Sequence, residues 1–116
     1  MKSSHILMVG AALVGVAIFF SLKRNTGADT TAHQMVEKEG ALLLDVRSPA
    51  EFADHSIEGS VNIPIGELES RLSELPDTSR PIVVYCRSGS RSSAAAEILS
   101  KHGYAKVYNM RRVTAW

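Results

Sequence analysis

Two short apolar runs place the strongest limit on what this chain can fold into. Residues 41–46 read ALLLDV and residues 81–85 read PIVVY. Each run is almost wholly apolar but too short for a buried helix, which is the pattern of a strand covered on both faces in a parallel sheet. A polar turn and a helical segment follow each run. The alternation predicts a small α/β domain whose parallel sheet is flanked by helices.

The remaining segments continue this alternation. Thr30 and Thr31 can cap a helix that ends near Glu39. Ser48, Pro49 and Glu51 have the spacing of a capping box with proline at the first helical position, which predicts a short helix. Further elements are expected in four ranges, a strand at 61–63, a helix at 65–75, a helix at 92–102 and a strand at 105–108.

Residues 6–22 form a run of 17 residues without a charge. This length is at the lower limit for a helix that crosses a bilayer, and the run lacks the polar face of a core helix. It ends at Lys23 and Arg24, as a stop-transfer segment does. We expect a tail at 1–5, one transmembrane helix at 6–22, a linker at 23–30 and a domain at 31–116. A signal peptide cleaved after Ala28 is the alternative.

The charges that flank the apolar run favour one orientation. Lys23 and Arg24 follow the run and Lys2 precedes it, and this small excess after the run favours a cytoplasmic domain. We therefore expect a single-pass protein of the inner, cytoplasmic membrane, with lipid around residues 6–22. Cleavage of the segment would instead release an exported domain.

Composition and charge exclude several classes of function. The formal net charge is +1, and basic residues alternate with acidic ones, so the chain lacks the basic stripe of a nucleic-acid-binding protein. Cys86 is the only cysteine and closes no intramolecular disulfide. His5, His33 and His102 have no ligand spacing with Cys86 or with one another, so we expect neither a metal nor another cofactor.

Cys86 has the sequence environment of a reactive thiol. It follows the second apolar run and precedes RSGSR, which leads into a helix. Backbone N–H groups at a helix N-terminus favour an anion, and Arg87 and Arg91 add positive charge. We therefore expect the pKa of the Cys86 thiol to lie below its ordinary value. An inert thiol buried at a strand end is the alternative, for which this polar loop is a poor environment.

Several motifs resemble those of the rhodanese homology domain. Residues 86–91 (CRSGSR) are similar to its active-site loop, which has a nucleophilic cysteine, a central glycine and a closing arginine. Residues 45–47 (DVR), Glu51-Phe52 and residues 55–64 (HSIEGSVNIP) are similar to the first half of that domain. The resemblance covers residues 32–116 and implies a rhodanese-like fold with its active site at Cys86.

The resemblance implies a sulfurtransferase. Cys86 would take a sulfane sulfur from a small anionic donor such as thiosulfate, hold it as a persulfide and pass it to a thiol or a cyanide-like acceptor. Asp45 and Arg47 would support the site through a structural hydrogen bond or salt bridge, and His55 would be structural. The residues that would bind the donor and the persulfide, largely through backbone amides, are Arg87, Ser88, Gly89, Ser90 and Arg91.

Two features depart from that family. Its members commonly carry a Gly-Gly pair shortly before a tryptophan near the C-terminus, where this chain has Arg111-Arg112 before Trp116. Arginines adopt a turn with positive φ only at a cost, so we expect strain there. Members also usually continue beyond this tryptophan, so we expect the last packing layer to be incomplete.

Two other functions are compatible with a cysteine in such a loop. Cysteine phosphatases and arsenate reductases place an arginine after five intervening residues, where this chain has Ser92, and Arg91 comes one position earlier. The second is a non-catalytic rhodanese-like module that binds a partner or reports sulfur status at the membrane. Inactive modules commonly lose the cysteine, which this chain keeps.

Overall fold

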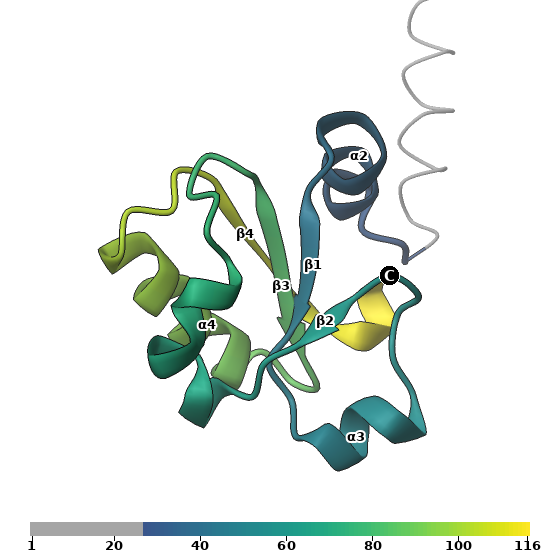
Figure 1. Cartoon of the computed structure of the whole chain (residues 1–116). Coiled ribbons are helices and arrows are strands. Elements are labelled where there is room, and N and C mark those ends of the chain that lie inside the picture. Colours follow the sequence, from purple (N-terminus) through teal and green to yellow (C-terminus); the bar gives the residue numbers. More distant parts are fainter. Residues whose placement is uncertain (1–26) are drawn as a thin grey trace, which may run out of the picture.

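The computed structural model of the chain describes residues 27–116. A four-stranded sheet lies at the centre of this part, and each pair of neighbouring strands is parallel. The predicted α/β fold with a parallel sheet is therefore confirmed (Figure 1). The strands, in the spatial order β2-β1-β3-β4, are β1 (Leu42–Asp45), β2 (Val61–Asn62), β3 (Ile82–Cys86) and β4 (Val107–Arg112).

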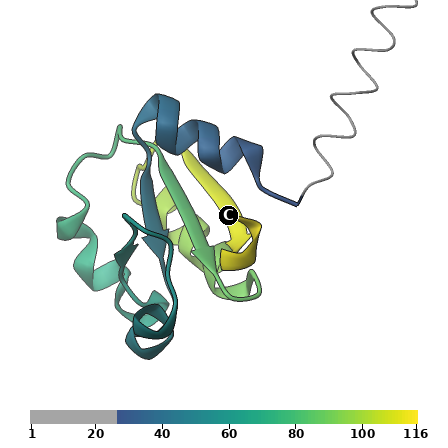
Figure 2. The ribbon, with the colours of Figure 1, turned by 90° about the vertical axis from the view of Figure 1, so that its right-hand side faces the viewer.

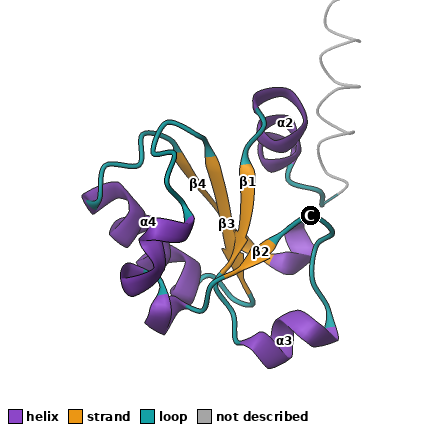
Figure 3. Ribbon diagram, in the orientation of Figure 1, coloured by secondary structure: helices purple, strands orange, loops and turns teal. Residues whose placement is uncertain are grey.

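Helical segments cover both faces of the sheet. One face carries α4 (Ser90–Lys101) with two 3₁₀ segments, η1 (Ile65–Glu67) and η2 (Glu69–Glu74). The other face carries α2 (Thr30–Glu39) and η3 (Val113–Ala115). Figure 2 looks onto the side of the molecule that carries α2 and η3. The short helix α3 (Pro49–Asp54) lies beyond the carboxyl ends of the strands (Figure 3).

Strand β3 divides the core into two clusters. Successive residues of a strand point to opposite faces, and all five residues of β3 are buried, which explains the unbroken apolar run. Val84 and Cys86 pack in the cluster on the α4 side, whereas Val83 and Tyr85 pack in the cluster on the α2 side. The side chain of Cys86 therefore faces the helix that follows it in the chain.

Two helix starts show how the sequence directs local structure. Asp29, and neither Thr30 nor Thr31, caps α2, since its Oδ1 accepts a hydrogen bond of 3.0 Å from the Ala32 amide. The predicted capping box of α3 is confirmed. Ser48 Oγ accepts from the Glu51 amide at 3.2 Å, and the Glu51 carboxylate accepts from the Ser48 amide at 3.1 Å.

The predicted helix at 65–75 is wrong in type. This segment forms η1 and η2, and Arg71 leaves helical geometry with φ −113° and ψ 16°. Ile65 and Leu68, and likewise Leu72 and Leu75, are three positions apart, a spacing that a 3₁₀ turn aligns on one face. The apolar pattern was therefore read with the wrong period, although Leu68 and Leu75 are buried as expected.

Some element boundaries also differ from the predictions. Cys86 is the last residue of β3 and does not follow it, and α4 begins at Ser90, two positions earlier than expected. The last strand occupies 107–112 and not 105–108. The predicted tail at 1–5, the transmembrane helix at 6–22 and the first half of the linker, 23–26, lie outside the described residues. From residue 27 onward, none of the helices has the length and apolar character required to cross a membrane.

Candidate active site

The candidate site lies where the order of strands reverses. From β1 the chain moves to β2 on one side, and from β3 it moves to β4 on the other. In an open parallel sheet, the crevice at the carboxyl ends of such a pair of strands is the usual ligand site. Asp45 is the last residue of β1 and Cys86 is the last residue of β3, so the two residues lie side by side at the carboxyl ends of adjacent strands.

The sulfur of Cys86 accepts hydrogen bonds from the loop and from the first turn of α4. The Gly89 amide donates to Sγ at 3.0 Å, and the Ser92 amide donates to it at 3.4 Å. The residue is fully buried, so these amides are not diverted to water. Cys86 is thus buried, as the alternative hypothesis expected, and amides at a helix N-terminus point at its sulfur, as the reactive-thiol hypothesis expected.

Ser92 adds a hydroxyl that can respond to the charge on the sulfur. Its side chain is fully buried, its Oγ lies 3.5 Å from Sγ, and it donates to the Gly89 carbonyl at 3.0 Å. When the thiol ionises, the hydroxyl proton can turn from the carbonyl to the sulfur. The Gly89 carbonyl keeps a partner, because the Ser93 amide also donates to it at 3.0 Å. The switch therefore leaves no buried acceptor unpaired.

These contacts shift the ionisation of Cys86. Burial by itself raises the pKa of the thiol, but hydrogen bonds from the Ser92 side chain and from the amides of Ser92, Gly89 and Ser88 outweigh it. The pKa therefore lies below its ordinary value, in the direction that the sequence predicted. The amides of the loop and of the first turn of α4 lower the pKa as predicted, and the Ser92 hydroxyl, which was not predicted, makes the largest of these contributions.

Gly89 makes the turn between the strand and the helix possible. Its φ is 109°, in the region that favours glycine, and it occupies the N-cap position of α4. A side chain at this position would also meet Arg111, whose Cβ lies 3.4 Å from the place that a Cβ on Gly89 would occupy. The side chains of Arg87, Ser88 and Ser90 are exposed around this turn.

Arg91 is bound to Glu51. Its guanidinium donates to the two carboxylate oxygens at 2.7 and 3.1 Å, so α4 is tied to α3 across 40 positions of sequence. The hydrogen bond from Arg91 is the main cause that lowers the pKa of Glu51 to about 2. The same bond chiefly raises the pKa of Arg91, and the charge of Cys86 adds to this. Arg91 is thus a positioning group whose charge is largely compensated.

Asp45 and Arg47 form the salt bridge that the sequence predicted. Both are buried, and Arg47 Nη2 lies 2.7 Å from Asp45 Oδ2. Arg47 also donates to the carbonyl of His55, and its guanidinium carbon lies 5.7 Å from the centre of the Tyr85 ring. The Asp45 carboxylate is the main cause that raises the pKa of Arg47. The pair holds the loop that contains His55 against the end of the sheet.

Sequence reasoning missed two contacts of the site. Ser92 was considered only as the place where a longer loop would have its arginine, although its position in the first turn of a helix that starts at an anion cradle is a usable signal. The contact of Arg111 with Gly89 has no comparable signal, because it joins two segments 22 positions apart. In the part of the chain from 27 to 116, no three His, Cys, Asp or Glu side chains gather as metal ligands would.

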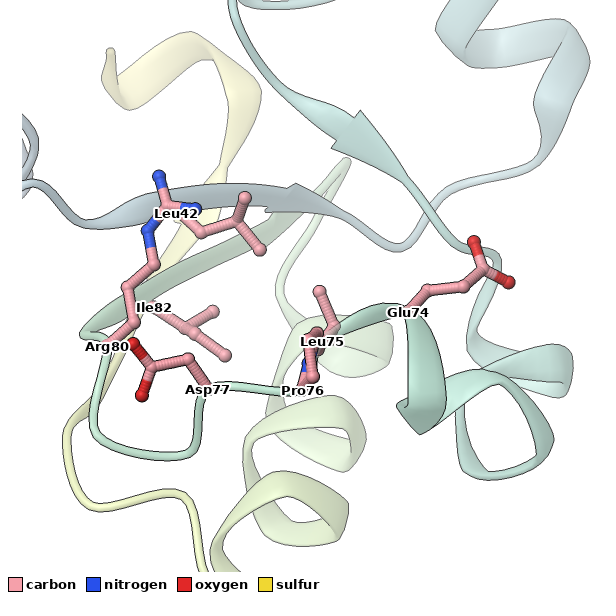
Figure 4. A pocket seen from close by; sticks show the side chains of 7 residues that line it. All are labelled: Leu42, Glu74, Leu75, Pro76, Asp77, Arg80 and Ile82. Atoms are coloured by element: carbon pink, nitrogen blue, oxygen red, sulfur yellow. The ribbon is translucent and has the colours of Figure 1, made fainter.

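A cavity of about 210 Å³ lies elsewhere (Figure 4). Leu42 and Ile82 contribute to its lining, and they are the first residues of β1 and β3, whereas Cys86 is the last residue of β3. In a parallel sheet the first and last residues of the strands lie at opposite ends of the sheet, along the strand direction. The cavity is therefore separate from the cysteine site.

Comparisons with known proteins agree with this geometry. The model of the rhodanese-like domain family matches residues 29–112. A protein of Allochromatium vinosum named sulfurtransferase is 37% identical over 90 residues, which are 77% of this chain and 83% of that protein. Thiosulfate sulfurtransferase PspE of Escherichia coli is 39% identical over 67 residues, which are 57% of this chain and 64% of that protein.

Solved structures give the same result. A structure described as a rhodanese with anions from E. coli superposes with a TM-score of 0.62 at 34% sequence identity, and the match covers 66% of this chain and 91% of that one. The human single-domain sulfurtransferase TSTD1 superposes with the same TM-score at 28% identity, and the match covers 79% of this chain and 93% of that one.

Proposed function

Because the chain belongs to the rhodanese-like domain family, we propose that Cys86 carries a sulfane sulfur from a small anionic donor such as thiosulfate to a thiol or a cyanide-like acceptor. Sulfur transfer is the activity named for the relatives in Allochromatium vinosum and E. coli. The donor, the acceptor and the roles of the loop residues are our assignment. The enzyme class is a rhodanese-type sulfurtransferase.

The first half-reaction forms a persulfide. The Cys86 thiolate attacks the outer sulfur of thiosulfate, a new S–S bond forms, and the bond from that sulfur to the sulfonate breaks. The bonding pair leaves with sulfite. The persulfide is anionic, so the three negative charges of the reactants are conserved and no proton is transferred.

The second half-reaction restores the cysteine. Cyanide or a thiolate attacks the outer sulfur of the persulfide, and the electron pair returns to Sγ as a thiolate. The amides of Gly89 and Ser92 and the Ser92 hydroxyl favour negative charge at Sγ, which is the leaving group of this step. Arg87, Ser88 and Ser90 surround the loop and would contact the donor, while Arg91 holds the loop to Glu51.

One observation carries the proposal: two backbone amides and one hydroxyl converge on a buried sulfur whose pKa is lowered. An inert core cysteine has no need of this arrangement, since a neutral thiol is satisfied by apolar packing alone. The same groups stabilise the Sγ thiolate that attacks the donor and that leaves in the second half-reaction.

The test is a mass measurement on the full chain. Incubation with thiosulfate should add one sulfur, about 32 Da, and cyanide or a thiol should remove it. Cys86→Ser should keep the fold and gain no mass, because it removes the only thiol of the chain. Ser100→Ala, an exposed serine in α4, is the matched control and should behave as the wild type. A wild-type chain that gains no sulfur would contradict the proposal.

A second candidate function draws support from the burial of Cys86. A sulfur with no exposed surface suits a rhodanese-like module that holds a thiol without turning it over and that binds a partner or senses sulfur. Such a module would take up the sulfur once and would not release it to cyanide. Repeated production of thiocyanate over many turnovers would exclude it.

We also propose that residues 6–22 anchor the domain in the inner membrane and that the domain lies in the cytoplasm. The run of 17 uncharged residues before Lys23 and Arg24 supports this. In intact cells, a membrane-impermeant thiol reagent should leave Cys86 unlabelled and should label it after permeabilisation. Labelling in intact cells would place the domain on the outer side.

A further inference from the structure

Arg111 has the only positive φ of a non-glycine residue within 27–116, at 74°. It follows a bulge in β4. Val84 pairs with Asn109 and Tyr85 pairs with Arg111, so Met110 has no partner on β3 and is buried instead. Bulges and left-handed residues with side chains are costly, and they concentrate at functional sites, where they aim a side chain.

The side chain of Arg111 runs along the loop that holds the sulfur. Its Cβ, Cγ and Cδ lie 3.4, 3.6 and 3.8 Å from the place that a Cβ on Gly89 would occupy. Gly89 is the residue whose amide donates to Cys86 Sγ at 3.0 Å. The absence of a side chain at Gly89 thus makes room for the stem of Arg111, and the guanidinium begins one bond beyond the last of these carbons.

The charge of Arg111 is not compensated by an acidic partner. Among the ion pairs of residues 27–116, Arg47 is matched by Asp45 and Arg91 by Glu51, whereas Arg111 takes part in none. Its side chain is exposed. The exposed Arg87 and Arg112 belong to the same end of β3, since Arg87 follows Cys86 in the chain and Arg112 pairs with it across the sheet. Three exposed arginines therefore belong to the end of the sheet that carries Cys86.

We propose that Arg111 is a specificity-determining residue that favours anionic sulfur donors over neutral ones. The inference rests on the proposed function of Cys86. Thiosulfate carries two negative charges, so a nearby cation raises its local concentration and holds it for attack by the thiolate. Removal of the charge should raise KM for thiosulfate and change kcat little, because the cation acts on binding and not on the sulfur that is transferred.

The test compares two alkylating reagents on the full chain. Iodoacetate is an anion and iodoacetamide is neutral, and Cys86 is the only thiol with which either can react. Arg111→Gln keeps most of the side-chain stem and removes the charge. At low salt, Arg111→Gln should lower the rate at which iodoacetate alkylates Cys86 about threefold and should leave the rate with iodoacetamide unchanged. For thiosulfate, with twice the charge, kcat/KM should fall about tenfold. High salt should abolish both differences.

Two further variants separate charge from structure. Arg111→Lys keeps the charge and should preserve the wild-type ratio of the two alkylation rates. Arg111→Gly should show the ratio of Arg111→Gln but a higher melting temperature than the wild type, because glycine adopts a positive φ without strain. Lys101→Gln removes one exposed charge at the far end of α4, about 16 Å along the helix from Ser90, and should leave the ratio unchanged.

The outcomes distinguish this inference from the proposed function. Suppose that Arg111→Gln shows the wild-type ratio of the iodoacetate rate to the iodoacetamide rate and that the chain still gains sulfur from thiosulfate. The proposed role of Arg111 is then overturned, and the proposed sulfurtransferase function stands. If the ratio changes but no sulfur is gained, Arg111 governs anion access to a cysteine that has another function. A folded chain that neither reagent alkylates and that gains no sulfur from thiosulfate contradicts both.

Discussion

At the scale of single residues, the chemistry of the site depends on what surrounds one sulfur. Burial alone would raise the pKa of the Cys86 thiol, and the hydrogen bonds outweigh burial and lower it below its ordinary value. Ser92 supplies two of them, from its amide and from its hydroxyl, and no other residue contributes both. The side chain of Ser92 is therefore the part of the cradle that can be removed without a change in the backbone.

Ser92→Ala should make Cys86 less reactive. Without the hydroxyl, the thiolate loses one donor, so its pKa rises and a smaller fraction is ionised at neutral pH. The rate of alkylation by iodoacetamide at pH 7 should fall about threefold to tenfold. At a pH high enough to ionise the thiol fully, the rates of variant and wild type should converge.

The matched control is Ser93→Ala. Ser93 is the next residue of α4, but it is exposed and its hydroxyl accepts a hydrogen bond from Asn109 at 3.1 Å. The Ser93→Ala variant should be alkylated by iodoacetamide at the wild-type rate at every pH. Equal rates for Ser92→Ala and wild type at pH 7 would show that the amides alone hold the thiolate.

The sequence predicted which residues belong to the site better than it predicted the long-range contacts between them. The loop after β3, the glycine with positive φ and the Asp45–Arg47 pair follow from local sequence, because each involves residues within a few positions of one another. The bond from Arg91 to Glu51 spans 40 positions, and only the folded chain brings the two together. The sequence led us to expect that Arg91 orients the loop and helps to bind the donor, but it did not show that Glu51 is the partner of its guanidinium.

At the scale of elements, Glu51 joins two functions in one carboxylate. It accepts the Ser48 amide in the capping box of α3, and it receives the guanidinium of Arg91 from α4. The pair couples the helix at the carboxyl ends of the strands to the helix that carries the anion cradle. The hydrogen bond from Arg91 is the largest cause that lowers the pKa of Glu51 to about 2, and hydrogen bonds from Ser48 add to it.

Glu51→Gln should remove a stability that depends on pH. The pKa of Glu51 is lowered from 4.5 to about 2, so its contribution is fully present above pH 4.5 and is lost as the pH falls toward 2. Because both side chains are nearly a third exposed, solvent screening reduces the contribution to about 1 to 2 kcal/mol. Urea unfolding at pH 7 and at pH 2.5 should show that the difference between wild type and variant shrinks at the lower pH.

A glutamine at position 51 can still accept a hydrogen bond from the Ser48 amide. The variant therefore removes the ion pair with Arg91 and keeps the capping box. Glu97→Gln, in an exposed pair with Lys101 at 3.7 Å, is the control and should leave the free energy of unfolding almost unchanged at both values of pH. A difference for Glu51→Gln that stays constant from pH 7 to pH 2.5 would contradict the assignment.

The elements themselves were predictable where the pattern of burial is simple. β1 and β3 are covered on both faces and read as apolar runs, and α3 carries a complete capping box. The segment at 65–74 has apolar residues three and four positions apart, which suits either helix type, so its 3₁₀ form was missed. The bulge in β4 was also missed, because nothing in the local sequence shows that Met110 is the unpaired residue.

At the scale of the whole domain, the sheet separates two clusters with different roles. The cluster on the α4 side contains Cys86, whereas the cluster on the other side joins the first and last segments of the described chain. The Asp29 amide donates to the Ala115 carbonyl at 2.7 Å, and Tyr108 donates to the Asp29 carboxylate at 2.8 Å. Figure 1 shows the C-terminal end close to the start of α2.

Trp116 completes this junction of the two segments. Its ring stacks on His33 of α2, with 3.7 Å between centroids and 19° between planes, and a ring nitrogen of His33 lies 2.7 Å from the Trp116 carbonyl. A half-buried tryptophan covers apolar surface that would otherwise face water. The aromatic side chain therefore stabilises the docking of α2 from outside the cluster that contains the sulfur.

Trp116→Ala should weaken the domain without disturbing the site. Loss of the half-buried ring should cost about 2 kcal/mol of unfolding free energy, near half the cost of a fully buried tryptophan. Amide hydrogen exchange should accelerate in α2, while the alkylation rate of Cys86 stays at its wild-type value, because the sheet lies between the two clusters. Thr114→Ala, at an exposed position of η3, should change neither quantity. Slower or faster alkylation in Trp116→Ala would show that the two faces of the sheet are coupled and that the junction of the chain segments tunes the thiolate.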